Sequence, residues 1–144
     1  MEKLLLVEDD PTLIRILTSF LTTENFQITS VTGQKAAAEA MEADRPDLAL
    51  VDISLAEGNG FAVCANAKEL GIPVIFLTAS SDEFSVVTGL DMGADDYISK
   101  PFRPRELVSR IRSVLRRAGK RQSIIALGDL SVDTDKGTVT RDGK

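Results

Sequence analysis

Polar residues that can hold a divalent cation or a phosphoryl group end or follow four short apolar segments of this sequence. Glu8 and Asp9 follow the first of these segments, Asp52 ends the second, and Thr78 and Lys100 end or follow the other two. Carboxylate oxygens without imidazole or thiolate favour Mg²⁺, which binds a few carboxylates, waters and a phosphate oxygen. A carboxylate nucleophile beside an ammonium and a hydroxyl suits phosphoryl transfer. The set therefore predicts a Mg²⁺ site and phosphoryl transfer to an aspartate.

These residues act together only if they meet at one edge of a sheet. In an open parallel sheet, ligands bind outside the carboxyl ends of the strands. Asp9 and Asp52 then approach closely, and two like charges 4 Å apart repel by about 4 kcal/mol at an effective dielectric of about 20. That repulsion requires a compensating cation. Taken singly, an acid after a strand is more often a helix N-cap and a lysine is usually solvated, so the prediction depends on the conjunction.

The apolar segments recur at the spacing of a βα repeat. Runs such as LLLV, LALV and VIFL are continuous, as in strands that helices cover on both faces of a parallel sheet. Segments with helical periodicity lie between them, and Pro11 suits the first position of one helix. The sequence thus predicts a doubly wound α/β fold. Its predicted strands begin near Leu4, Gln27, Leu48, Val74 and Tyr97, and its predicted helices span about 11–21, 34–42, 61–69, 83–91 and 104–117.

The composition excludes several classes of site. The chain has 144 residues, which suits about one domain, and 43% of them are hydrophobic; it has one cysteine and no histidine. Histidine-dependent catalytic triads, His-ligated metals and an intramolecular disulfide are therefore excluded within this chain. The start does not resemble a signal peptide and no segment approaches a membrane span, so we expect a cytoplasmic protein without a membrane partner. We expect Cys64 to be a buried, inert thiol.

The two ends of the chain differ in charge and pattern. Residues 1–100 carry a net charge of −11, and residues 101–144 carry a net charge of +6. After the helix predicted to end at Arg117, residues 118–123 are polar and include a glycine, which is typical of a linker. The following segments alternate apolar and polar residues around a turn, which predicts a β-hairpin that is marginal alone. We therefore expect the sequence to be part of a longer protein.

Four strings closely resemble the CheY-like receiver domain of two-component response regulators. They are VEDD (7–10), LALVDISL (48–55), VIFLTAS (74–80) and GADDYISKPF (93–102), in the order and spacing of that family, and the resemblance extends over residues 1–119. It implies a flavodoxin-like fold with a five-stranded parallel sheet in the order 2-1-3-4-5. It also implies a protein that catalyses only its own phosphorylation and dephosphorylation, with a sensor histidine kinase as the phosphoryl donor in trans.

The resemblance further implies roles for single residues. One aspartate accepts the phosphoryl group, an acidic pocket and one backbone carbonyl hold Mg²⁺, a hydroxyl and an ammonium contact the phosphoryl oxygens, and one aromatic side chain follows the hydroxyl as a switch. In that order, these residues are Asp52 as phosphoacceptor; Glu8, Asp9, Asp52 and the Ser54 carbonyl as metal ligands; Thr78 and Lys100 at the phosphoryl group; and Thr78 and Tyr97 as the switch.

The tail GDLSVDTDKGTVTRDGK resembles the start of an OmpR/PhoB-type winged-helix effector domain. This implies a receiver domain over 1–119, a linker over 120–124 and an N-terminal hairpin fragment of a DNA-binding domain over 125–144. These residues include no recognition helix, so DNA binding and control of transcription require the missing part. In that subfamily, phosphorylation promotes homodimers through the fourth helix, fifth strand and fifth helix. The matching dimer residues are Asp91, Asp95, Asp96, Glu106 and Arg110.

Two other functions compete with this interpretation. An aspartyl-phosphate phosphatase shares the sheet, the nucleophilic aspartate and Mg²⁺, but it needs a second aspartate two residues later, where Ser54 stands. A phosphorylation-independent interaction module keeps the fold and binds a partner without switching. The complete set of acidic, hydroxyl and lysine positions argues against that module. Stable modification of Asp52 by a small acyl phosphate would distinguish a receiver domain from it.

Overall fold

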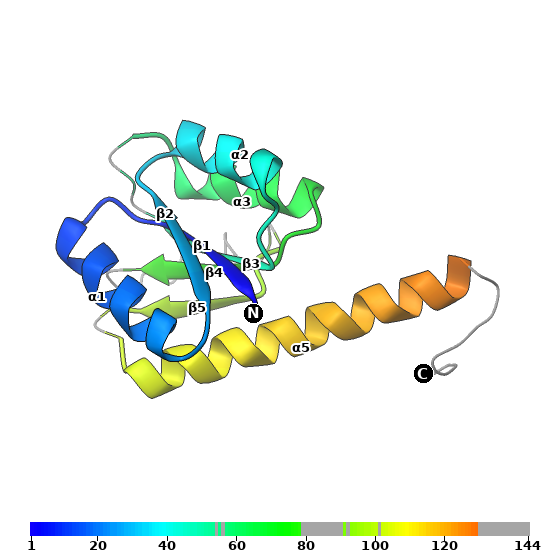
Figure 1. The fold of residues 1–144 in the computed structure, drawn as a ribbon. Coiled ribbons are helices and arrows are strands. Elements are labelled where there is room, and N and C mark those ends of the chain that lie inside the picture. The colour runs from blue at the N-terminus through cyan, green and yellow to red at the C-terminus, as the bar shows by residue number, and fades with distance from the viewer. Residues whose placement is uncertain (54, 56, 79–90, 92, 101, 130–144) are drawn as a thin grey trace. The chain divides into compact units, whose positions relative to one another are not determined.

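Five parallel strands form one sheet, in the order β2-β1-β3-β4-β5 (Figure 1). The structure is a computed structural model that describes residues 1–53, 55, 57–78, 91, 93–100 and 102–129, with side chains described as far as residue 119. The predicted strand order is confirmed, and each predicted strand start lies within one residue of the observed start. The strands are β1 (Lys3–Val7), β2 (Gln27–Val31), β3 (Leu48–Asp52), β4 (Val74–Thr78) and β5 (Asp96–Ser99).

The central strands are buried along their length. Every residue of β3 and β4 is buried, and so are four of the five residues of β1, whereas the edge strand β2 has none buried. A strand between two helical layers must present an apolar side chain to both faces, which explains the uninterrupted runs in the sequence. Asp52 and Thr78 are the polar last residues of two such strands, so each carries a buried polar side chain to the edge of the sheet.

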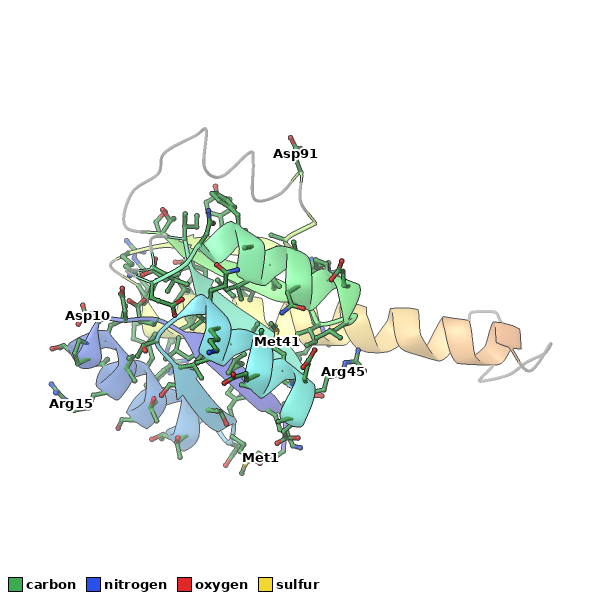
Figure 2. The ribbon with its side chains drawn as sticks, turned by 90° about the horizontal axis from the view of Figure 1, so that it is seen from above. Met1, Asp10, Arg15, Met41, Arg45 and Asp91 are labelled. Atoms are coloured by element: carbon green, nitrogen blue, oxygen red, sulfur yellow. The ribbon has the colours of Figure 1, made fainter. Side chains whose placement is uncertain are left out.

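Helix α1 (Pro11–Thr23) begins directly after the acidic segment that follows β1. Its N-cap is Asp10, whose Oδ1 accepts hydrogen bonds from the N–H groups of Thr12 and Leu13 at 3.0 and 3.4 Å. Pro11 occupies the first helical position, where a missing N–H costs nothing. Asp10 therefore serves as a cap at the start of α1 (Figure 2), which separates its role from those of Glu8 and Asp9.

Helices α2 (Gln34–Ala43) and α3 (Gly60–Glu69) lie together on one face of the sheet, and α1 lies on the other (Figure 1). The doubly wound arrangement is therefore confirmed. Met41 of α2 and Cys64 of α3 pack in the same buried cluster as Phe76 of β4. Cys64 is buried, as predicted, and burial raises the pKa of its thiol, so the reactive thiolate is disfavoured.

The C-terminal helix differs from the prediction. The fold divides into two compact units at Ile111, and α5 (Pro104–Asp129) begins in the first unit and continues into the second. The helix does not end at Arg117 as expected but continues to Asp129, so residues 120–124, which were expected to form a linker, lie within it. No proline interrupts residues 105–129, most of these residues favour helix, and Gly119 and Gly128 each cost only about 1 kcal/mol relative to alanine.

Two predicted elements fall mainly outside the described residues. The hairpin expected over 125–144 begins within α5, which ends at Asp129, and residues 130–144 are not described. The helix expected over 83–91 is described only at Asp91. Among the described residues, no helix combines the length and apolar character needed to cross a membrane.

Truncation of Phe76 should strongly destabilise the first unit. Its ring is 1% exposed and packs edge-on against Phe61, with 5.4 Å between the ring centroids. Phe76→Ala is expected to lower the free energy of unfolding by about 3–5 kcal/mol, measured by urea denaturation. The control Ile16→Ala, at a side chain that is 54% exposed, should cost no more than about 1 kcal/mol. Equal losses in the two variants would contradict this packing.

Candidate functional site

Three carboxylates meet where β1 and β3 end. The two strands pair in parallel with Val7 opposite Val51, so Glu8 and Asp52 come next to each other at the same edge of the sheet. One oxygen from each of Glu8, Asp9 and Asp52 lies within 4.8 Å of the other two. Glu8 is 1% exposed and Asp52 is 4% exposed, while Asp9 is half-buried. The predicted convergence of these carboxylates is confirmed.

Lys100 brings a positive charge to the same carboxylates. Its Nζ donates a hydrogen bond to Glu8 Oε1 at 3.1 Å and lies 3.5 Å from Asp52 Oδ2. The lysine follows β5, and its backbone N–H donates to the carbonyl of Thr78 at 2.7 Å. Because the end of β5 is fixed to β4 in this way, the ammonium group reaches across to the carboxylates that follow β1 and β3.

Thr78 is placed beside the carboxylates by the strand register. Asp52 pairs with Leu77, and the backbone N–H of Ile53 donates to the Leu77 carbonyl at 3.1 Å, so Thr78 stands one residue farther along the same edge. Its side chain is 5% exposed. The sheet therefore brings together the predicted hydroxyl, ammonium and carboxylates, although they are up to 92 residues apart in the sequence.

The charges of this cluster oppose one another strongly. Two carboxylates 4.8 Å apart repel by about 3 kcal/mol at an effective dielectric of about 20. The pKa of Glu8 is raised by burial first and also by the charge of Asp52, whereas hydrogen bonds from Lys100 and from the Asp10 N–H oppose the rise. Relative to the unfolded chain, Glu8 thus favours folding below its ordinary pKa and loses that contribution as the pH rises through its higher folded-state pKa.

The donor atoms of this cluster fit Mg²⁺. All three side chains offer hard carboxylate oxygens, and the chain has no histidine that would favour a softer metal. Lys100 neutralises part of the negative charge, and a divalent cation would neutralise more of it. The fourth ligand implied by the family resemblance, the carbonyl of Ser54, lies outside the described residues.

Tyr97 lies in β5, beside the strand that carries Thr78. It pairs with Phe76 in the register of β4 and β5, and its half-buried ring packs against the buried cluster under α2 and α3. Tyr97 thus occupies the neighbouring strand that a switch partner of Thr78 requires. Its role as a switch remains a prediction.

Four of the predicted dimer residues make ion pairs within this chain. Arg110 binds both oxygens of Asp96 at 2.9 Å and Glu106 at 3.1 Å. These contacts raise the pKa of the guanidinium, and the slight burial of Arg110 opposes the rise. Asp95 accepts from Lys68 at 3.2 Å and from the Val74 N–H at 2.9 Å. The fifth residue, Asp91, is exposed and points away from the sheet (Figure 2). Their part in a dimer remains a prediction.

Sequence reasoning did not identify Gly60 as part of the site. A Cβ on this first residue of α3 would lie 2.3 Å from the carbonyl oxygen of Asp52, so the helix starts directly against the backbone of that aspartate. The signal in the sequence is the pair Asn59-Gly60, an N-cap residue followed by a glycine, eight residues after Asp52. The contact itself depends on the fold.

Comparisons with known proteins agree with this geometry. Residues 4–112 match the response regulator receiver domain family. The DNA-binding response regulator MtrA of Mycolicibacterium smegmatis is 40% identical over 145 residues, which cover 99% of this chain and 64% of MtrA. The probable transcriptional regulator ycf27 of Porphyridium aerugineum is 38% identical over 152 residues, which cover 99% of this chain and 63% of that relative. The chain therefore spans less than two thirds of the length of either relative.

Solved structures give the same result for the fold. The BeF3-activated N-terminal receiver domain of Klebsiella pneumoniae RstA superimposes with a TM-score of 0.75 at 30% identity, covering 79% of this chain and 98% of that domain. A CheY-like response regulator receiver domain protein from Methanospirillum hungatei gives a TM-score of 0.80 at 28% identity, covering 84% of this chain and 98% of that protein.

Mg²⁺ is expected to stabilise the folded protein through this cluster. A ligand at about 100 times its Kd stabilises the state that binds it by about 2.7 kcal/mol. Asp9→Asn removes one ligand and one repelling charge, so this variant should be more stable than the wild type without Mg²⁺ and should gain less when Mg²⁺ is added. Urea unfolding with and without MgCl2 measures both quantities.

The control for this prediction is Glu39→Gln, at an exposed carboxylate of α2. It should keep the full Mg²⁺ response of the wild type. A wild type that Mg²⁺ does not stabilise, or an Asp9→Asn variant that keeps the whole response, would show that the cluster does not bind the ion.

Proposed function

Because this chain belongs to the response regulator receiver family, we propose that Asp52 accepts a phosphoryl group in a Mg²⁺-dependent reaction. The observation that carries the proposal is the contact of Lys100 with both Glu8 and Asp52 inside the carboxylate cluster. An ammonium group held there can exchange a carboxylate oxygen for a phosphoryl oxygen. Buried carboxylates that served only as helix caps would not require a lysine from a distant strand.

The proposed reaction is an in-line displacement at phosphorus. A carboxylate oxygen of Asp52 forms the new O–P bond while the P–N bond of a donor phosphohistidine breaks, and the imidazole leaves with the electron pair. Glu8, Asp9 and Asp52 would hold Mg²⁺, which supplies charge neutralisation at the phosphoryl oxygens when it is bound. Lys100 would bind one phosphoryl oxygen, and the hydroxyl of Thr78 would donate to another.

A phosphohistidine donor must lie outside these 144 residues, because they contain no histidine. We therefore propose a sensor histidine kinase as the partner. The proposed metal ligands, hydroxyl and ammonium group would all come from this chain, so the kinase would need to supply only the phosphohistidine. On this proposal the chain turns over no substrate other than its own aspartyl phosphate.

The proposed switch links the phosphoryl group to β5. A hydrogen bond from Thr78 to a phosphoryl oxygen would favour one of two arrangements of the chain after β4, and Tyr97 would follow because β5 pairs directly with β4. Phosphorylation would in this way change the surface near the start of β5, where Asp95 and Asp96 lie. We propose that this change promotes a homodimer.

The proposed dimer uses charged residues around β5 and α5. Arg110 already binds Asp96 and Glu106 in one chain, and the same groups can bind their counterparts across a two-fold axis. Asp91 and Asp95 would add two carboxylates to that surface. In a longer protein with an effector domain like that of the DNA-binding relatives, such pairing would bring two DNA-binding domains together and regulate transcription.

Phosphorylation of Asp52 is directly testable with acetyl phosphate and Mg²⁺. The wild type should gain the mass of one phosphoryl group, and this gain should disappear when EDTA removes the metal ion. Asp52→Asn should abolish the modification because it removes the nucleophilic carboxylate. Intact-mass spectrometry measures the outcome.

Asp44→Asn is the matched control, since Asp44 lies after α2 and pairs with Lys3 at the opposite end of the sheet. This variant should be phosphorylated like the wild type. Modification of Asp52→Asn at the wild-type level would contradict the assignment. A folded wild type that stays unmodified would support an interaction module that does not switch.

The homodimer is testable by light scattering with beryllofluoride and Mg²⁺. The mass should change from one chain toward two when both are added. Arg110→Ala should raise the dimer dissociation constant about fivefold, since exposed ion pairs contribute up to about 1 kcal/mol each. Arg45→Ala, at an arginine that binds the carbonyl of Gly71, should leave the dissociation constant unchanged. An unchanged mass with beryllofluoride and Mg²⁺ would refute switchable dimerisation.

A further inference from the structure

The loop between Asp52 and α3 is fixed to the beginning of α2. The backbone N–H of Gln34 donates to the carbonyl of Glu57 at 3.2 Å, and Gly33 and Glu57 form a parallel β-bridge. The side-chain Oε1 of Gln34 accepts a hydrogen bond from the backbone N–H of Asn59 at 3.0 Å. Backbone and side chain of one glutamine thus hold both ends of a three-residue segment of this loop.

Gly58, the middle residue of that segment, packs closely against the side chain of Gln34. Gly58 has φ of +91°, and a Cβ at this position would lie 2.3 Å from the Cβ of Gln34. A larger residue would meet both a strained backbone conformation and this side chain. The described part of the loop is therefore packed closely against the glutamine.

The same segment determines where α3 begins. Asn59 is the N-cap of α3, and its Oδ1 accepts from the N–H of Phe61 at 2.7 Å. The residue between them, Gly60, lies against the backbone of Asp52, since its Cβ would meet the Asp52 carbonyl oxygen at 2.3 Å and the Ile53 Cα at 2.9 Å. A shift of Asn59 would therefore press the start of α3 into, or draw it away from, the backbone that carries the phosphoacceptor.

We propose that Gln34 is a positioning residue for Asp52, acting through Asn59 and the close contact of Gly60 with the Asp52 backbone. The inference rests on the proposed function of Asp52 as phosphoacceptor and adds a residue of α2 to the site. Gln34 does not contact the reacting groups; it fixes the loop that fixes the start of α3. Small displacements of a nucleophile reduce the rate of an in-line reaction, because the attacking atom must be aligned.

The test compares Gln34→Met, which keeps the length of the side chain and removes the acceptor, with Gln34→Glu, which retains an acceptor oxygen. At saturating Mg²⁺ and acetyl phosphate, Gln34→Met should lower the phosphorylation rate constant about two- to twelvefold, the range that corresponds to a typical hydrogen bond. Gln34→Glu should remain within about twofold of the wild type. Gln27→Met is the matched control, because Gln27 is exposed and begins β2 at the opposite end of the sheet.

Backbone amide hydrogen exchange gives a readout that does not depend on phosphorylation. Gln34→Met should speed exchange at Asn59, whose N–H loses its acceptor, and at Ile53, whose N–H bonds to Leu77 beside Asp52. Thermal melting before the kinetic assays confirms that each variant is folded. Exchange at Leu5, in the centre of the buried β1, should remain that of the wild type in all variants.

The outcomes separate the positioning role from the proposed function. Wild-type rates in folded Gln34→Met would overturn the positioning role and leave phosphorylation intact, and so would a Gln34→Glu variant as slow as Gln34→Met. A folded wild type that acetyl phosphate does not modify would refute the proposed function. Exchange would then decide the remaining part: unchanged exchange at Asn59 and Ile53 in Gln34→Met would refute the anchoring of the loop as well.

Discussion

Repulsion among the carboxylates of Glu8, Asp9 and Asp52, balanced by the ammonium of Lys100, is the interaction on which the site depends. The parallel register of β1 and β3 places Glu8 next to Asp52 at one edge of the sheet, and nearly all residues of the two strands are buried. Burial also removes the Glu8 carboxylate from water, which disfavours its charged form and raises its pKa. Any cation that fits among the oxygens of such a cluster stabilises it, because the cation offsets the repulsion between the carboxylates. The same repulsion that strains the folded protein therefore favours the binding of a metal ion among the carboxylates.

Strand β5 connects the carboxylate cluster with ion pairs on two helices. β5 carries Lys100 at its end, while Asp95 and Asp96 lie at its start. Asp95 is bonded to Lys68 of α3, and Asp96 is bonded to Arg110 of α5. A displacement of β5 therefore changes the environment of ion pairs on two helices. On the proposed function, this connection is a physical route by which phosphorylation of Asp52 would reach the surface proposed for the dimer.

The strands, the polar residues at their ends and the convergence of these residues were predictable because they follow from local pattern and from one rule of parallel sheets. The order of the strands was implied by the resemblance to receiver domains. Continuous apolar runs fixed the strands, and the carboxyl ends of parallel strands share one edge. The C-terminal helix was not predictable from the same signals. Gly119 and its polar neighbours are compatible with both a linker and a helix, and intrinsic propensities differ by too little to decide between them.

The role of Gln34 could not be predicted for a different reason. Nothing in its sequence neighbourhood marks it, since a glutamine at the first position of a helix is ordinary. Its significance comes from a contact with Asn59, 25 residues later, and from the absence of a side chain at Gly60. Interactions between loops at one edge of the sheet depend on the packing of α2 against α3, which periodicity does not specify.

The most direct measurement of the central interaction is anomalous diffraction from crystals grown with Mn²⁺ as a substitute for Mg²⁺. We expect one strong anomalous peak among the carboxylate oxygens of Glu8, Asp9 and Asp52, with Lys100 still at the edge of the cluster. Carboxylates that remain close together around the lysine alone, with Mn²⁺ bound elsewhere or not at all, would contradict the view that this cluster is built to hold a divalent cation.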